Sequence, residues 1–377
     1  MRWTMGWALV LAGGLAMVAP GASAQRPPET HPASEQRDVV QGWDRSAVPG
    51  DIELWAPRTM LAHSHADTTL EYGYLHLVCA SRSDARQGRC PTEGSADSAV
   101  GLRAVPVLFT EARSGMTVEL AVQGGIQRLL SGRSCTRDYW QPAILAPWSS
   151  HALNCGADLP AGTGGQLSVP GRELQRLVAG IWTGTLSLQA RTPSGGVLAA
   201  YTFRFRFTVT DRNAVAIYLP EFDHATPSVG LDLRYSPFAQ TIEGRKVLDM
   251  CLYDGLGSQS TYLGVTARDN SGRPPGATGF SVWHSAGGSG ERQRVDYTAT
   301  LDYNGTAVAM ANGVEQRLSG IDTARLRLVM LPGMTQPVFC VPTPLTLATP
   351  RFPSTSKDAG YYVGQLQLEL RVPTFTP

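Results

Sequence analysis

The sequence carries almost no net charge and lacks the motifs of the common enzyme families. Arg2 is the only charged residue among the first 24, so the remainder has 32 − 1 = 31 basic against 31 acidic residues. A neutral chain has no electrostatic footprint for nucleic acid or anionic lipid. The sequence contains no GxSxG, no HExxH, no Walker glycine loop and no dinucleotide fingerprint. No cofactor is therefore predicted.

Beyond the amino terminus the sequence has no apolar stretch long enough to cross a bilayer. At the terminus, Arg2, the apolar stretch 7–18 and the small residues Ala22-Ser23-Ala24 are typical of a secretory signal. No cysteine follows the cleavage site, which argues against a lipid anchor. We predict a signal peptide at 1–24 and an exported mature protein without a transmembrane segment.

Six cysteines in an exported chain indicate a disulfide framework. Sequence alone allows many pairings, and spacing narrows them. Two pairs each bracket a polar loop, and the last two cysteines stand alone in the second half. We predict the pairs Cys79–Cys90, Cys135–Cys155 and Cys251–Cys340. The clustered CxxC spacing of a zinc site is absent.

Candidates for catalysis or metal binding are weak. His63 and His65 could ligate a metal on one strand face, but solvated surface histidines are the commoner explanation. The glycine-rich stretch 287–290 is not followed by a helix and indicates a turn. Glu71, Glu243 and Asp302 have no visible partner for glycosidase chemistry, and most such acids are surface charges.

Short alternating segments separated by Gly and Pro predict an all-β protein of two sandwich domains. We interpret residues 25–50 as a flexible lead, 51–211 as the first domain and 212–377 as the second. The polar hinge at 210–213 is too short for a floppy tether, so the domains should lie nearly end to end. Expected strands cover the following segments: 69–81, 100–112, 115–125, 181–191, 199–211, 247–255, 323–331 and 337–347. One or two helical turns are expected within 171–179.

Two further patterns stand out in the second half. Asn304-Gly305 between alternating segments predicts a two-residue hairpin turn. Near the carboxyl terminus, Leu366, Leu368, Leu370 and Val372 alternate with polar residues, as in a half-buried strand. Prolines follow, so it is open what covers the far edge of this strand.

Three arginines suggest a binding surface in the first domain. Arg204 and Arg206 lie on the outward face of the strand 199–211, and Arg191 ends the strand before it. Together they could bind acidic sugars or sulfates through bidentate hydrogen bonds. An ordinary solvated sheet face is the alternative.

Five segments together resemble a known family: GIWTGTLSLQ, IYLPEF, VLDMCLYDG, PVFCVP and AGYYVGQLQLEL. With all six cysteines in order, the stretch from about Leu70 to Val372 is similar to the minor tip adhesins of colonization-factor and cable-type pili, the CblD/CfaE family. The resemblance implies two immunoglobulin-like β-sandwiches end to end, an adhesin domain followed by a pilin domain that lacks its final strand. A periplasmic chaperone, and then the major pilin at the outer-membrane usher, would supply that strand beside Leu366, Leu368, Leu370 and Val372.

The resemblance therefore implies a non-enzymatic fimbrial tip adhesin and pilus initiator that binds a host or surface receptor such as a glycan. In the relatives, receptor binding depends on one arginine before the first cysteine and on a pair after the G-[IV]-W strand. Here Tyr74 lies near the first position and Thr192-Pro193 occupy the pair, beside Arg191. Tyr74 is either a sugar-stacking residue or a half-buried core residue. A non-adhesive structural initiator and a periplasmic carbohydrate-active enzyme are the alternative functions.

Overall fold

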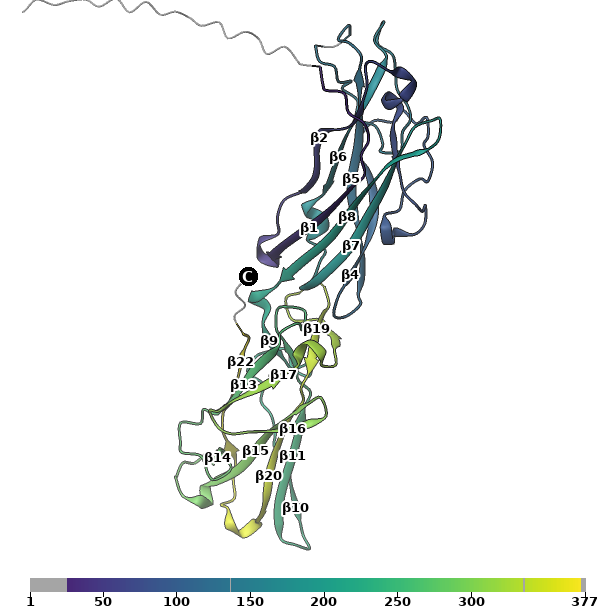
Figure 1. Cartoon of the computed structure of the whole chain (residues 1–377). Helices are drawn as coiled ribbons and strands as arrows, with labels where there is room; N and C mark the ends of the chain where they lie inside the picture. The colour runs from purple at the N-terminus through teal and green to yellow at the C-terminus, as the bar shows by residue number, and fades with distance from the viewer. Residues whose placement is uncertain (1–25, 136, 335, 374–377) are drawn as a thin grey trace, which may run out of the picture.

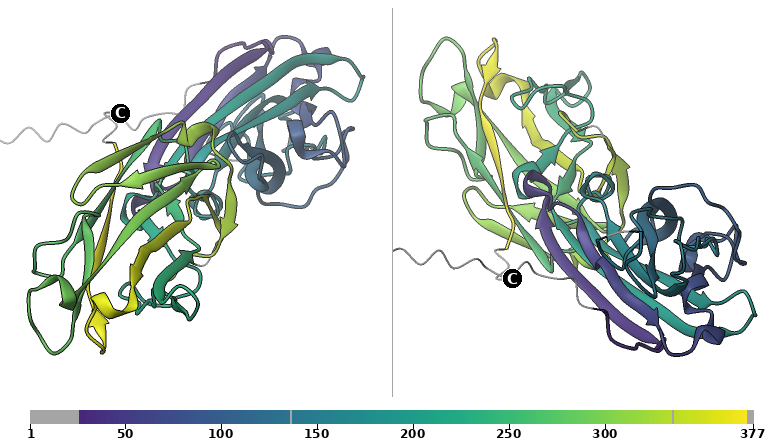
Figure 2. Two further views of the ribbon diagram at one scale, coloured as in Figure 1. Left: turned by 90° about the horizontal axis from the view of Figure 1, so that it is seen from below. Right: turned by 90° about the horizontal axis from the view of Figure 1, so that it is seen from above.

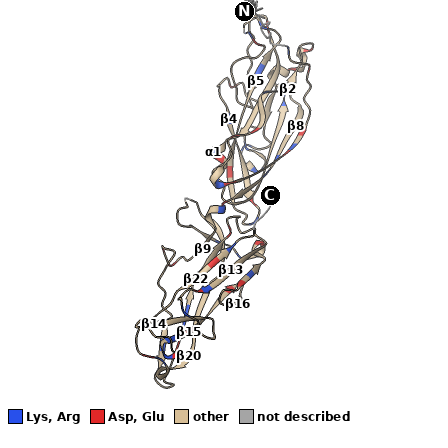
Figure 3. Ribbon diagram, turned by 90° about the vertical axis from the view of Figure 1, so that its left-hand side faces the viewer, with Lys and Arg blue, Asp and Glu red and all other residues tan. Residues whose placement is uncertain are grey.

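The computed structural model describes residues 26–135, 137–334 and 336–373, which form two β domains joined end to end (Figure 1). The all-β, two-domain fold class predicted from the sequence is confirmed. The predicted signal peptide lies outside the described residues. Among the helices of the described part, none is long and apolar enough to span a membrane. Basic and acidic residues are interspersed over both domains (Figure 3).

The first domain is one eight-stranded sheet with the strand order β1-β8-β7-β4-β5-β6-β2, in which β3 also pairs with β7. The guanidinium of Arg37 on β1 donates to the carbonyl of Leu54 on β2 at 2.6 Å, so the two edges of the sheet lie close together. The strands are β1 (Glu35–Asp44), β2 (Ile52–His63), β3 (His76–Val78), β4 (Arg103–Glu111), β5 (Thr117–Leu130), β6 (Pro160–Val169), β7 (Gly180–Arg191) and β8 (Val197–Thr210).

Strand β1 corrects the prediction of a flexible lead at 25–50. It pairs in parallel with β8 from Glu35 opposite Tyr201 to Asp44 opposite Thr210 (Figure 2). Val39 is buried, whereas Val40 points to solvent with 64% of its surface exposed. The prediction failed because only one inward-facing residue of β1 is fully buried, too few to give a clear alternating pattern.

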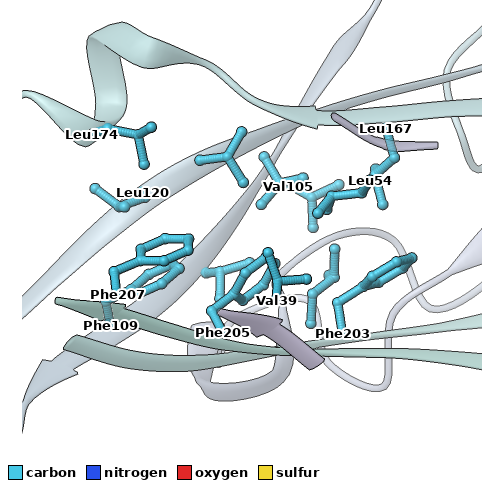
Figure 4. Close-up of a cluster of buried hydrophobic side chains, with 14 of the residues drawn as sticks. Val39, Leu54, Val105, Phe109, Leu120, Leu167, Leu174, Phe203, Phe205 and Phe207 are labelled. Carbon is cyan, nitrogen blue, oxygen red and sulfur yellow. The ribbon is translucent and has the colours of Figure 1, made fainter. Parts of the chain in front are cut away.

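The core of the first domain lies between β8 and the strands that face it. Phe203, Phe205 and Phe207 alternate along β8 and point inward, as the period of two predicts. Figure 4 shows these rings opposite the aliphatic side chains of Leu54, Leu120 and Leu167. Burying a phenylalanine at such a position stabilises the fold by roughly 1.5–3 kcal/mol.

The second domain divides its strands among three sheets. Their orders are β10-β11-β20-β15-β14-β21 (with β16 on β15), β18-β19-β12-β9 and β17-β13-β22. The bounds are β9 (Ala216–Tyr218), β10 (Leu233–Ser236), β11 (Thr241–Leu248), β12 (Cys251–Tyr253), β13 (Tyr262–Asp269), β14 (Phe280–His284), β15 (Arg294–Tyr303), β16 (Thr306–Met310), β17 (Glu315–Ser319), β18 (Arg327–Val329), β19 (Val338–Pro342), β20 (Leu345–Pro353), β21 (Tyr362–Val363) and β22 (Leu366–Arg371).

Local signals in the sequence succeeded where backbone chemistry decides the structure. Asn304 and Gly305 adopt positive φ of 51° and 78° between β15 and β16, which confirms the hairpin turn. The predicted helical turn appears as α1 (Gly171–Leu174). The strand expected at 69–81 is wrong: 3-10 turns at Thr68–Leu70 and Tyr72–Tyr74 precede the short β3, and Glu71 between them is left-handed.

Three disulfides join the cysteines in the pairs that the spacing predicted. They are Cys79–Cys90, Cys135–Cys155 and Cys251–Cys340, with Cα–Cα distances of 5.2, 5.8 and 5.7 Å. The first two close loops within the first domain, and the third joins β12 to β19 in the second. Each stabilises the fold by about 2–4 kcal/mol in the chain-entropy view, because it restricts the unfolded chain.

The joint between the domains is packed rather than open. Tyr253 and the disulfide Cys251–Cys340 belong to the same buried cluster as the core of the first domain. Gln259 of the second domain donates to the buried carboxylate of Glu111 at 2.8 Å, and Arg113 donates to the carbonyl of Ile321 at 3.3 Å. The short hinge is thus held by contacts on its flanks.

The pairing of β1 can be tested with two neighbouring valines. We expect Val39→Asp to lower the free energy of unfolding of the first domain by about 3 kcal/mol or more, because it buries an unpaired carboxylate. Val40→Asp, on the solvent side of the same strand, should change it by less than about 0.5 kcal/mol. Thermal unfolding of the two variants measures the difference, and equal stability would show that β1 is not part of the folded core.

Candidate functional site: an open groove and the distal pole

Strand β22 forms the edge of its sheet, as the alternation near the carboxyl terminus suggested. It pairs on one side with β13, from Leu366 opposite Asp269 to Arg371 opposite Gly264. No strand of the described residues pairs with its other side. Leu366, Leu368 and Leu370 are half-buried and pack against the second core, as does Val372 just beyond the strand.

A groove of about 1330 Å³ runs beside these leucines. Its floor is the apolar interior of the sandwich, which contributes Tyr297, Leu345 and Leu347. Its second wall is the segment 219–231, which has no strand and lines the groove with Leu219, Phe222, Val229 and Leu231. The groove therefore exposes part of the core of the second domain.

The arrangement combines the two features that attract another strand. A free strand edge presents unpaired backbone N–H and C=O groups, and the groove beside it offers sites for alternate side chains. Sequence reasoning identified the β22 edge but missed the opposite wall. The signal was present in Pro220 and Pro227, which interrupt an otherwise apolar segment and prevent it from pairing as a regular strand.

The three arginines expected to cluster in the first domain do not do so. Arg204 and Arg206 are exposed on β8, opposite Thr185 and Thr183 of β7. Arg191 lies at the far end of β7, six residues beyond Thr185, which corresponds to roughly 20 Å along a strand. The sequence could show that the three share a sheet face, but not that the register separates them.

Arg191 and Tyr74 instead lie at the distal pole, the end of the first domain farthest from the joint, where β2 and β5 end and β6 begins. Arg191 pairs with His76 of β3, and the carbonyl of Tyr74 lies 3.1 Å from Nδ1 of His76. Tyr74 is half-buried. Thr192 is buried in the neighbouring turn.

Buried polar groups fix the backbone of this pole. Arg128 is fully buried and donates to the carbonyls of Leu75, Ser149 and His151 at 2.6, 2.6 and 2.9 Å. No carboxylate of the described residues pairs with it, and burial lowers the pKa of its guanidinium to about 9. Three carbonyl acceptors offset the desolvation of a cation that remains protonated at neutral pH.

The weak candidates have structural partners. Glu243 forms an ion pair with Arg351 at 3.1 Å, and hydrogen bonds from Ser194 hold the pKa of Glu71 below its ordinary value. Nδ1 of His63 contacts the carbonyl of Pro28 at 2.9 Å. Within the described ranges, no group of three or more His, Cys, Asp or Glu could hold a metal ion.

Two sequence profiles match this chain over nearly its whole length. The profile of the first domain of the CFA/I fimbrial protein CfaE matches residues 20–212, and that of its second domain matches residues 215–374. The chain belongs to the CfaE family of CFA/I fimbrial proteins. The family resemblance drawn from the motifs is confirmed.

Individual members of this family share both sequence and fold with the chain. The CFA/I fimbrial protein CfaE of Escherichia coli is 29% identical over 316 residues, which cover 81% of each chain. The crystal structure of CfaE, the adhesive subunit of CFA/I fimbria of enterotoxigenic E. coli, has a TM-score of 0.73 at 24% identity and covers 93% of this chain and 95% of its own. A chaperone–tip adhesin complex of CFA/I fimbriae biogenesis gives 0.65 at 23% identity, covering 93% and 99%.

The pole contains a group whose titration affects stability. Burial, with repulsion from Arg128 and Arg191, lowers the pKa of His76 below its ordinary value of 6.5. The unfolded chain then binds a proton more readily than the folded one, so this stability is present above pH 6.5 and is lost as pH falls through the folded pKa. We expect His76→Gln to reduce the loss of stability between pH 7.5 and pH 5, measured from urea midpoints. An unchanged pH dependence would mean that His76 makes no such contribution.

Proposed function

We propose that this protein is the minor tip adhesin and assembly initiator of a chaperone–usher pilus. In this role the second domain anchors the protein to the fibre, and the first domain is presented outward to a surface receptor. The observation that carries the proposal is the unpaired edge of β22 beside a groove open to the core. Membership of a family of fimbrial proteins supports it.

An incoming strand would complete the second domain by donor-strand complementation. Its backbone would pair with β22, and its alternate side chains would pack onto Leu366, Leu368 and Leu370. Burying each large aliphatic side chain in the groove contributes roughly 1.5–3 kcal/mol. A strand with several such residues therefore stabilises the domain by an amount comparable to the whole stability of a small domain.

The proposed donors act in sequence. A periplasmic chaperone first covers the groove, and the amino-terminal extension of the major pilin then replaces it at the outer-membrane usher. The solved chaperone–tip adhesin complex of CFA/I biogenesis supports the first of these partners. The protein would pass through the periplasm and remain at the extracellular tip of the pilus, without enzymatic activity.

The first domain is proposed to bind the receptor through exposed polar residues. The earlier candidates fall into two places: Arg191 and Tyr74 at the distal pole, and Arg204 and Arg206 on the outer face of β8. The pole points away from the joint and so from the fibre (Figure 1). This position favours the pole as the surface that meets a receptor.

The groove is tested by adding the strand it lacks. A peptide matching the amino-terminal extension of the major pilin should raise the Tm of the full chain, in proportion to RT ln(1 + [L]/Kd). We expect Leu368→Asp to abolish this rise, because a carboxylate then faces the apolar groove. Differential scanning calorimetry with and without peptide measures the effect.

Gln367→Asp is the matched control, since its side chain lies on the exposed side of the same strand. This variant should still respond to the peptide. A full chain whose Tm is already high and does not change with peptide would contradict the proposed assembly role.

The adhesive role is tested separately with pilus-bearing cells. Contact through the pole predicts weaker surface adhesion for Arg191→Ala, whereas contact through the sheet face predicts it for Arg204→Ala. Arg172→Ala, an exposed arginine of α1 at the joint end, should leave adhesion unchanged. If no exposed substitution in the first domain affects adhesion, the domain is a structural cap rather than an adhesin.

A further inference from the structure

A second group of arginines, not singled out by the sequence, lies at the distal pole around Tyr139. The guanidinium carbon of Arg26 is 5.7 Å from the centroid of the Tyr139 ring, and that of Arg133 is 5.5 Å from it. Both arginines are exposed, and Tyr139 is half-buried. We call Arg26, Arg133 and Tyr139 the distal arginine patch.

Neither arginine of the patch has a carboxylate of the described residues within ion-pair distance. The acids nearby are engaged elsewhere. Asp138 pairs with Arg58 at 2.7 Å, Glu29 pairs with His65, and the largely buried Asp158 accepts from the backbone N–H of Ser134 at 2.6 Å. Two like charges thus share one ring without an internal counter-ion, which is unfavourable until an anion binds.

The backbone that carries the patch is fixed in place. The disulfide Cys135–Cys155 closes the loop after β5. The N–H of Leu130 donates to the carbonyl of Tyr139 at 2.8 Å, and Arg26 donates to the carbonyl of Ser131 at 3.2 Å. Segments far apart in the sequence are therefore held together at the pole, so ligand binding need not order the loop.

We propose that the distal arginine patch binds the acidic group of an anionic saccharide. The two guanidinium groups would donate bidentate hydrogen bonds to a carboxylate or sulfate. The exposed part of the Tyr139 ring would contact the apolar face of the sugar. This assignment rests on the proposed adhesive function and names the chemical class of its receptor.

The distribution of charge favours a local site over a general polyanion surface. The chain after the predicted signal is neutral, so long-range attraction to nucleic acid is weak. Sulfated glycosaminoglycans and sialylated glycans both carry the required acidic group. The experiment distinguishes these two sources.

The test measures binding of the full exported chain to a heparin-derived hexasaccharide, to 3′-sialyllactose and to neutral lactose by calorimetry. We expect one acidic saccharide to bind and lactose not to bind. Arg133→Ala and Arg26→Gln should each weaken that binding roughly tenfold, since each removes charge-assisted hydrogen bonds. Arg133→Lys should lose less, because it keeps the charge without the guanidinium fork.

Arg172→Ala is the matched control, because it removes an exposed arginine at the opposite end of the same domain. The proposal requires unchanged binding in this variant and an unchanged Tm in all of them. Failure of both acidic saccharides to bind would overturn the proposal. So would equal weakening by Arg172→Ala, which would indicate non-specific attraction, or binding that is insensitive to both Arg26 and Arg133.

These results are separate from those for the proposed function. Stabilisation by the pilin peptide depends on Leu368 in the second domain, which the patch variants do not touch. Loss of saccharide binding with an intact peptide response would locate the receptor site. A peptide response without any acidic saccharide binding would reject the patch and leave the assembly role in place.

Discussion

Every strand at the edge of a β-sheet has to find partners for its backbone N–H and C=O groups, and this protein meets that requirement in two different ways. In the first domain the chain supplies its own closing strand: β1 pairs along its whole length with β8, and Val39 enters the core. In the second domain the strand at the equivalent risk, β22, has a neighbour on one side only. Completeness of the first domain and incompleteness of the second account for the proposed division of labour between presentation and assembly.

The joint makes this division useful in a fibre. Tyr253 and the disulfide of the second domain pack into the core of the first, and Glu111 accepts a hydrogen bond across the boundary. A packed joint keeps the distal pole on the far side of the molecule from the groove, as Figure 1 shows. An incoming strand at β22 would therefore not compete with a receptor at the pole, since the two surfaces lie on separate domains.

The pole itself is organised by buried polar groups rather than by regular strands. Arg128 holds three loop carbonyls, and a disulfide closes the loop that carries Arg133 and Tyr139. Such a network is rigid only when each member is satisfied. It gives the pole a defined shape on which exposed residues can vary, which is consistent with a family that keeps its fold while the residues at the relatives' arginine positions change.

Local pattern in the sequence determined the class of fold, the phenylalanine face of β8, the Asn304-Gly305 turn and the alternation of β22. Each of these depends on side chains a few residues apart, where backbone geometry fixes direction. Only the tertiary structure decided that β1 belongs to the first sheet, that Arg191 lies far from Arg204, and that Arg26 meets Arg133 on one tyrosine. Strand register and loop packing bring together residues that are distant in the chain, and no local periodicity encodes those distances.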